Sequence, residues 1–177
     1  MATDGPEQDL WVFGYGSLMW RPGFPYVERR EARVRGYHRA LCVFSHVHRG
    51  TPERPGLVLG LDRGGSCRGV AFRVAAADAA GTLAYLRARE QPTAVYLERR
   101  MEAHLDDGRV AEAVAYVVDR RHGQYAGRLP EERLLSLVRH GIGQSGANPD
   151  YVLSTHHHLV AMGVIDPVLA RLSAALG

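Results

Sequence analysis

The stretch Leu10 to Trp20 reads LWVFGYGSLMW and sets two glycines, a tyrosine and a serine between two apolar runs. The first run, LWVFG, is typical of a buried β-strand. Because glycine lacks a Cβ, Gly14 and Gly16 let the chain turn sharply where a side chain would collide. Amides in such a turn can point the same way and bind an anion. The stretch therefore predicts a strand followed by either an anion-binding loop or a plain glycine-rich turn.

The composition is that of an ordinary globular protein. The chain has 177 residues, of which 46% are hydrophobic and 23% charged, so we expect a single domain over residues 1–177 with one core. No apolar run approaches the roughly 20 residues that cross a bilayer, and the first nine residues do not resemble a signal peptide. We therefore expect a cytoplasmic protein that does not bind a membrane.

The basic residues narrow the possible chemistry. All 22 are arginines, and the sequence contains no lysine. A Schiff base with a lysine is therefore excluded, and a Walker-type phosphate loop would lack its lysine. The net charge is +3, but the arginines are scattered among the acidic residues rather than gathered in a stripe. We expect a small-molecule partner and no nucleic acid.

Hydrophobic periodicity differs between the two parts of the sequence. Alternating, strand-like segments dominate up to residue 74, separated by glycine and proline clusters such as DRGGS at 62–66, and helical segments gather later. We expect strands over 10–14, 32–45, 56–62, 67–74, 94–105 and 109–119, with a hairpin turn at 106–108. Helices are expected over 78–90 with Asp78 as N-cap, 130–140, 148–163 with Asn148 as N-cap, and 166–176. The class is α+β, with a largely antiparallel sheet or small barrel and flanking helices.

Glu90 stands out at the end of the first expected helix. It lies on the same helical face as Leu83 and Leu86, which indicates partial burial. Burial and the negative end of the helix dipole would both raise the pKa of this carboxyl toward the range of a general acid or base. The alternatives are neutralisation by Arg87 or Arg89, or exposure at a fraying helix end, and the sequence leaves them open.

Other reactive residue types suggest weaker sites. The run His156-His157-His158 fans out around a helix and cannot converge on one ion, while His46 and His48 lack a carboxylate pair. No nucleophile elbow surrounds Ser17, and Cys42 and Cys67 fit reduced core positions. We expect no metal and no cofactor.

Several motifs together resemble one family. VFGYGSLMW at 12–20, RGYHR at 35–39, HRGTPERPG at 48–56, GVAFRV at 69–74, LRAREQ at 86–91 and YAGRLPEE at 125–132 resemble the ChaC family of glutathione-specific γ-glutamylcyclotransferases. The similarity runs in order from about residue 10 to residue 158. It implies a small mixed β-barrel with flanking helices.

The resemblance also implies an activity and a site. The substrate would be glutathione or another γ-glutamyl compound, and the products 5-oxoproline and a released amine, with no cofactor. Glu90 matches the family's catalytic glutamate, which would act as general acid and base. The γ-glutamyl group would be held by Val12, Phe13, Gly14, Tyr15, Gly16, Ser17 and Leu18, with Tyr125 lining the same pocket.

Arg49 and the segment after Glu90 bear on the choice of substrate. Where many relatives have Gly-Gly-Tyr or Gly-Ala-Tyr after the glutamate, this chain has Pro92-Thr93-Ala94-Val95-Tyr96, which puts substrate choice in question. Arg49 is a secondary candidate for binding the substrate's far carboxylate, because an arginine fork matches that group. Alternative functions are a cyclotransferase for other γ-glutamyl amino acids or amines, and a non-catalytic binding or regulatory protein.

Overall fold

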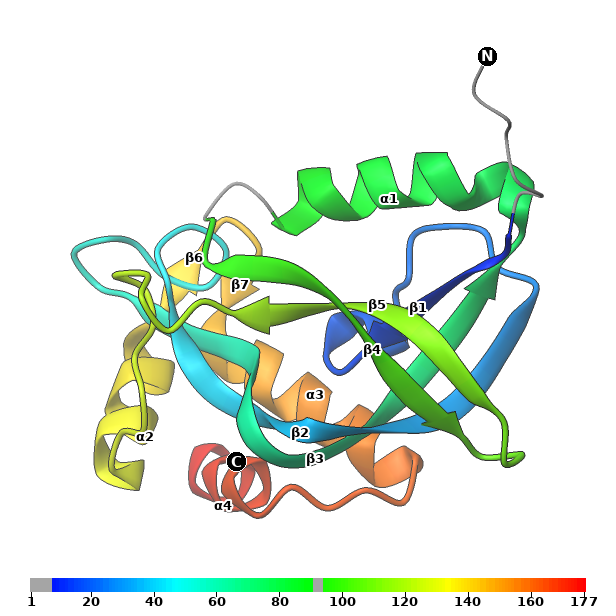
Figure 1. The fold of residues 1–177 in the computed structure, drawn as a ribbon. Helices are drawn as coiled ribbons and strands as arrows, with labels where there is room; N and C mark the ends of the chain where they lie inside the picture. The colour runs from blue at the N-terminus through cyan, green and yellow to red at the C-terminus, as the bar shows by residue number, and fades with distance from the viewer. Residues whose placement is uncertain (1–7, 91–93) are drawn as a thin grey trace. The chain divides into compact units, whose positions relative to one another are not determined.

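The structure is a computed structural model that describes residues 8–90 and 94–177. Its strands and helices confirm the α+β class (Figure 1). In chain order they are β1 (Leu10–Gly14), the short 3-10 helix η1 (Ser17–Met19), β2 (Glu28–Ser45), β3 (Gly56–Val74), α1 (Ala76–Glu90), β4 (Tyr96–Leu105), β5 (Val110–Val118), α2 (Glu131–His140), β6 (Ile142–Gly143), β7 (Gly146–Ala147), α3 (Asn148–Ala161) and α4 (Pro167–Leu176).

The chain divides into two compact units. Unit 1 comprises Met1–Arg39 and Arg63–Val117, and unit 2 comprises Ala40–Asp62 and Val118–Gly177. The long strands β2 and β3 therefore each contribute to both units, whereas the opening loop and α1 belong to unit 1 alone.

Five strands form a closed barrel in the order β1-β3-β2-β4-β5. In unit 1, β1 pairs antiparallel with β3, placing Val12 opposite Phe72, and parallel with β5, placing Val12 opposite Val114. The parallel pair makes the barrel mixed, as the resemblance implied. Because β1 has a partner on each side, the point at which it ends, Gly14, is firmly placed.

One strand prediction was wrong, because β3 runs unbroken through the segment expected to interrupt it. Gly64 and Gly65 have φ angles of +101° and +69°, which glycine adopts at little cost. The chain therefore bends without leaving the sheet, as bulged strands do. The His38 ring also hydrogen-bonds the carbonyl of Gly64 at 2.9 Å.

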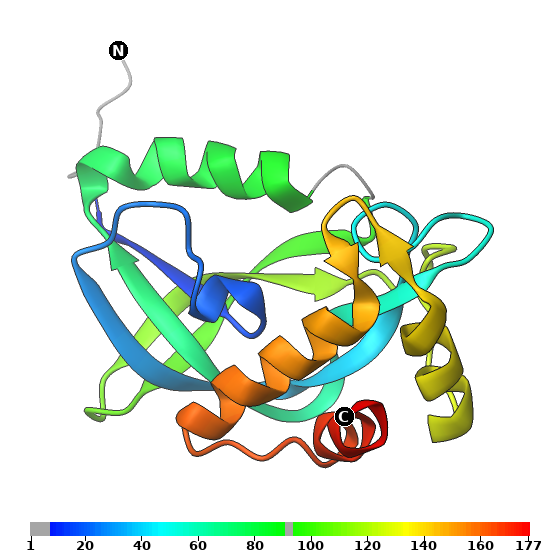
Figure 2. The same cartoon turned by 180° about the vertical axis from the view of Figure 1, so that it is seen from behind.

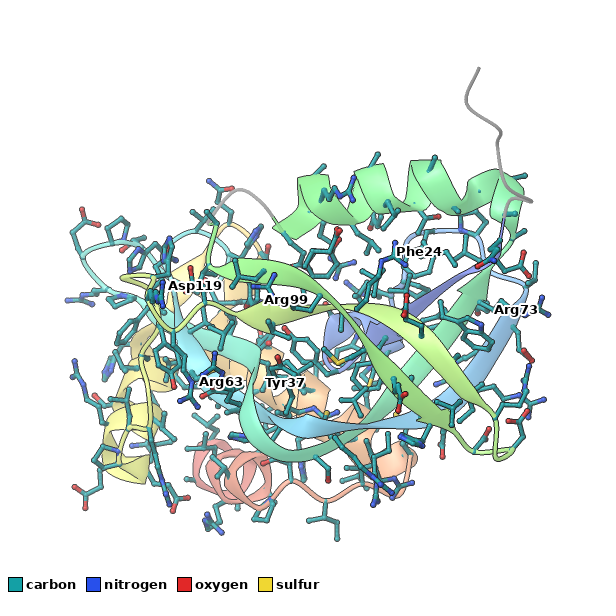
Figure 3. The ribbon with its side chains drawn as sticks, viewed as in Figure 1. Phe24, Tyr37, Arg63, Arg73, Arg99 and Asp119 are labelled. Atoms are coloured by element: carbon teal, nitrogen blue, oxygen red, sulfur yellow. The ribbon has the colours of Figure 1, made fainter. Side chains whose placement is uncertain are left out.

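Helix α1 begins at Ala76 rather than at the expected Asp78 cap. The carboxylate of Asp9 accepts the Ala76 amide at 3.0 Å and pairs with Arg73 at 2.7 Å; Arg73 is labelled in Figure 3 on the strand that leads into α1. These two bonds, that from Arg73 foremost, lower the pKa of Asp9. A group from outside the helix therefore satisfies its first turn.

Several local signals were read correctly. The turn at residues 106–108 forms, with Gly108 at a φ of +89°. Asp166, which was not predicted as a cap, caps α4 by accepting the Leu169 amide at 3.1 Å. The bounds of α2 and α4 agree with the expected helices to within a residue, because each has its stop or cap in the adjacent sequence.

In unit 2, α2, α3 and α4 pack against one another (Figure 2). The start of α3 differs from the expectation, since Asn148 does not cap it and no side chain does. Asn148 is instead fully buried, where its amide accepts the Leu57 N–H and donates to the Leu57 carbonyl, both at 2.8 Å. The Asn148 side chain therefore hydrogen-bonds to β3, which is distant in sequence, instead of capping α3 as its position suggested.

We predict that Asn148→Ala lowers the free energy of unfolding by about 2 to 4 kcal/mol, because two buried backbone groups of Leu57 lose their partners. Urea unfolding followed by circular dichroism measures this change. Gln144→Ala, at an exposed position between β6 and β7, is the control and should change stability by less than about 0.5 kcal/mol. Equal effects of the two variants would contradict the structural role of Asn148.

Candidate functional site

The loop after β1 is a compact turn around η1. Met19 donates to the carbonyl of Gly16 at 2.9 Å, and Arg21 donates to that of Ser17 at 2.7 Å. A Cβ at Gly14 would lie 2.9 Å from the Cβ of Leu18, so the chain can double back only with glycine there. Among the described residues, no acceptor is found for the amides of Gly16 and Ser17, which leaves two backbone donors for a ligand.

The seven loop residues named from the resemblance differ in accessibility. The side chains of Val12 and Phe13 are fully buried in the unit 1 core, and that of Leu18 is nearly so. Tyr15, Gly16 and Ser17 are partly exposed. The accessible part of the loop is therefore Tyr15-Gly16-Ser17, and the substrate contacts expected of the full stretch stay a prediction.

Arg39 of β2 fastens this loop to the barrel. Its Nε donates to the Tyr15 carbonyl and its Nη2 to the Arg68 carbonyl on β3, each at 2.6 Å. Charged donors make the stronger kind of hydrogen bond. Sequence reasoning missed this role, because an arginine on an alternating strand shows no sign of what it reaches.

Glu90 is the last residue of α1 and is half-buried. Of the two residues expected on this face, Leu86 is buried and Leu83 is half-buried, and Thr82 of the same helix is buried as well. Loss of hydration raises the pKa of the Glu90 carboxyl, and the charge of Arg89 opposes that rise with a smaller effect. The described residues offer this carboxylate no hydrogen bond or ion pair. Neutralisation by Arg87 is ruled out, since its guanidinium pairs with Glu98 at 3.0 Å.

Arg89 joins the end of α1 to the loop. Its Nη2 donates to the Ser17 hydroxyl at 2.6 Å, and its Nη1 donates to the Arg21 carbonyl at 3.2 Å. Phe24, labelled in Figure 3, packs edge-on against Tyr85 of α1 with ring centroids 6.4 Å apart. The helix end that carries Glu90 is therefore held beside the loop.

A second group of polar side chains lies near Glu90 on β4 and β5. The Tyr116 hydroxyl donates to Glu98 at 2.8 Å. Burial, this hydrogen bond and the charges of Glu98 and Glu90 raise the pKa of Tyr116. The pKa of Glu98 is lowered, chiefly by the hydrogen bond from Arg87. The two carboxyl groups are therefore shifted in opposite directions, Glu98 toward the ionised form and Glu90 toward the neutral form. In the amino-acid sequence, Tyr116 differs from its neighbours only as a hydroxyl within the apolar run AVAYVV.

Tyr125 and Arg49 belong to unit 2, and their substrate roles stay predictions. The Tyr125 hydroxyl donates to the carboxylate of Asp62 at 2.8 Å, and Asp62 also pairs with Arg120 at 2.7 Å. Burial, followed by this hydrogen bond, raises the pKa of Tyr125 to about 12.

The Arg49 guanidinium already has partners in unit 2. It donates to the Ala147 carbonyl at 3.0 Å and lies over the Tyr151 ring, 5.5 Å from its centroid. These contacts explain a half-buried arginine without a ligand.

The remaining reactive residues form no such arrangement. Among residues 8–90 and 94–177, no three histidine, cysteine or acidic side chains are grouped as metal ligands. Cys42 and Cys67 are buried thiols, and burial raises the pKa of Cys42 to about 12, which makes it a poor nucleophile at neutral pH. No helix within these ranges is long and apolar enough to span a membrane.

Comparison with known proteins decides the family. A model described as ChaC-like protein matches residues 10–176. The chain belongs to the ChaC-like family. Two relatives of this ChaC-like chain are named glutathione-specific γ-glutamylcyclotransferase. The Escherichia coli K12 protein is 35% identical over 94% of this chain and 72% of its own length, and human protein 1 is 37% identical over 85% and 70%.

A solved structure shares the fold. The yeast γ-glutamyl cyclotransferase specific to glutathione aligns with a TM-score of 0.84 at 23% identity, covering 95% of each chain. This likeness confirms the expected fold of the ChaC-like chain, a small mixed barrel with flanking helices.

The departure from the family pattern after Glu90 falls partly outside the described residues, which omit 91–93. Ala94 has a φ of +54°, and within the described ranges it is the one residue other than glycine with a positive φ. Side chains are strained in this region. Ala94 of the ChaC-like chain thus has a backbone conformation that favours glycine, and Val95 beside it is fully buried.

We predict that Glu90→Gln stabilises the protein at neutral pH. A folded-state pKa above the unfolded one means that the folded form binds more protons, so stability falls as pH rises between the two values. Glutamine has no such cost. The variant should therefore melt at a higher temperature than the parent at pH 7, and the difference should shrink below the ordinary glutamate pKa of 4.5. A parent that is more stable at pH 7, or a difference independent of pH, would contradict burial of the carboxylate.

Proposed function

We propose that this chain is a γ-glutamylcyclotransferase that cleaves glutathione to 5-oxoproline and Cys-Gly. The observation that carries the proposal is a half-buried glutamate of raised pKa at the end of α1, tied through Arg89 to a glycine loop in which the amides of Gly16 and Ser17 have no acceptor among the described residues. Perturbed carboxylates of this kind are typical of acid-base sites. The names of the relatives support glutathione as the substrate.

The proposed reaction needs no nucleophile from the protein. The α-amino nitrogen of the substrate attacks its own γ-carbonyl carbon, a new C–N bond closes the five-membered lactam, and the C–N bond to the cysteine residue breaks. Glu90 takes a proton from the amine and delivers it to the leaving nitrogen, so protons balance over the cycle. A raised pKa suits both steps, because the group must gain and lose a proton near neutral pH.

The loop would bind and orient the γ-glutamyl group. The amides of Gly16 and Ser17 can hold the glutamyl carboxylate or the oxyanion that develops on the γ-carbonyl. Holding the substrate in a folded conformation adds a proximity effect, since effective molarities of well-oriented intramolecular reactions reach roughly 10⁵ to 10⁸ M. Tyr125 is proposed to bind the substrate, as the family resemblance implies.

Three wider predictions accompany this function. The family match spans residues 10–176 and thus parts of both units, which supports a single domain. A glutathione-cleaving enzyme is expected in the cytoplasm, and its partner is expected to be a small molecule with no role for nucleic acid.

We predict that Glu90→Gln lowers kcat for 5-oxoproline formation from glutathione by about a hundredfold or more, since general acid-base groups contribute roughly 10²- to 10⁴-fold. The assay follows 5-oxoproline and Cys-Gly by chromatography. Asp78→Asn removes an exposed carboxylate from the first turn of the same helix and should leave kcat unchanged. If the Glu90 variant matched its parent, the catalytic assignment would fail and the binding-protein alternative would gain support.

We predict that the protein turns over glutathione with a higher kcat/KM than γ-glutamyl-alanine, which lacks the cysteinyl-glycine portion. Parallel progress curves at matched concentrations measure the ratio. Preference for the smaller substrate would favour a cyclotransferase for other γ-glutamyl amino acids. The unusual segment after Glu90 is where the chain would differ from glutathione-specific relatives in that case.

A further inference from the structure

We propose that Arg89 is a positioning residue whose guanidinium fixes the glycine loop against the end of α1, so that the loop and Glu90 keep one defined spacing. The inference rests on the proposed function. The sequence analysis considered Arg89 only as a possible neutralising partner of Glu90, and the names of the relatives assign it no role. Its hydrogen bonds to described residues lie within unit 1.

The contacts of Arg89 span the loop. Its guanidinium reaches the Ser17 hydroxyl at the start of η1 and the Arg21 carbonyl beyond its end, at 2.6 Å and 3.2 Å. One further N–H approaches the Tyr85 hydroxyl, one helical turn earlier, at 3.4 Å. A planar fork with several fixed donors can bridge such separate acceptors, whereas a lysine ammonium acts as a point charge.

A second arginine holds the loop at Tyr15. Arg39 bonds the Tyr15 carbonyl and ties it to β3 through Arg68. The loop is therefore fixed to the barrel by Arg39 and to the helix by Arg89. Loss of Arg89 leaves the first attachment intact and releases the second, which is the one that sets the distance between the loop and Glu90.

Arg89 also adjoins Glu90 electrostatically. Among the described residues, the charged group that acts on the Glu90 carboxylate is Arg89 on α1, and the Glu90 charge in turn helps to raise the pKa of Tyr116 on β5. Tyr116 donates a hydrogen bond to Glu98 on β4, and the charge of Glu98 is paired with that of Arg87. Because Arg89 is the positive neighbour that lowers the Glu90 pKa, removing its charge should raise that pKa.

Three variants separate the two effects. Arg89→Gln removes both the charge and the fork, Arg89→Lys keeps the charge without the fork, and Ser17→Ala removes one hydrogen bond without changing the charge. Arg133→Gln, an exposed arginine on α2, is the control for loss of a charge. The measurements are kcat and KM for glutathione, the Glu90 pKa from carboxyl ¹³C NMR, and hydrogen exchange of the loop amides.

We expect Arg89→Gln and Arg89→Lys to lower kcat by about tenfold to a hundredfold, because small displacements of reacting groups have effects of this order. Ser17→Ala should show a smaller loss. The amides of residues 17–21 should exchange faster in both Arg89 variants. The Glu90 pKa should rise in Arg89→Gln alone, and Arg133→Gln should match the parent throughout.

Two results would overturn the inference. Full activity and unchanged loop exchange in Arg89→Lys would show that charge alone matters, and unchanged loop exchange in Arg89→Gln would show that the fork does not hold the loop. If the parent fails to cleave glutathione, the proposed function fails separately. The exchange and NMR measurements, which need no turnover, then still decide whether Arg89 positions the loop and tunes Glu90.

Discussion

The site depends on keeping one carboxyl group away from water at the end of α1. The helix face that carries Glu90 also carries the buried Leu86, so packing of the helix and partial dehydration of the carboxylate occur together. An isolated buried carboxylate is destabilising unless it is paired or takes up a proton. Arg87 does not pair with Glu90, because its guanidinium is bound to Glu98. The Glu90 carboxyl can therefore exchange a proton with a ligand.

The surrounding polar groups hold this arrangement rigid. The guanidinium groups of Arg39 and Arg89 donate hydrogen bonds to the loop, to the Tyr15 carbonyl and the Ser17 hydroxyl respectively. A chain whose basic residues are all arginine is well suited to this, because each fork can satisfy two or more carbonyl or hydroxyl groups at once. Under the proposed mechanism, stability and catalysis oppose each other at Glu90, as is common in active sites.

Local patterns predicted much of the fold and one half of the site. The spacing of Leu83, Leu86 and Glu90 indicated the buried face, and the glycines after β1 indicated the tight loop. Long-range partners could not be predicted, because nothing near Asp9, Arg89 or Asn148 in the sequence reveals what each of them reaches. The same limit explains β3, where Gly64 and Gly65 look like a break until their positive φ angles are seen to bend one continuous strand.

The pH dependence of kcat/KM for glutathione tests the central claim most directly. If the sheltered Glu90 carboxylate is the general base, the rate should rise with pH along an acid limb whose midpoint lies above the ordinary glutamate pKa of 4.5. A profile that stays flat as the pH is lowered to 4.5, so that any acid limb has its midpoint at or below that value, would contradict the account.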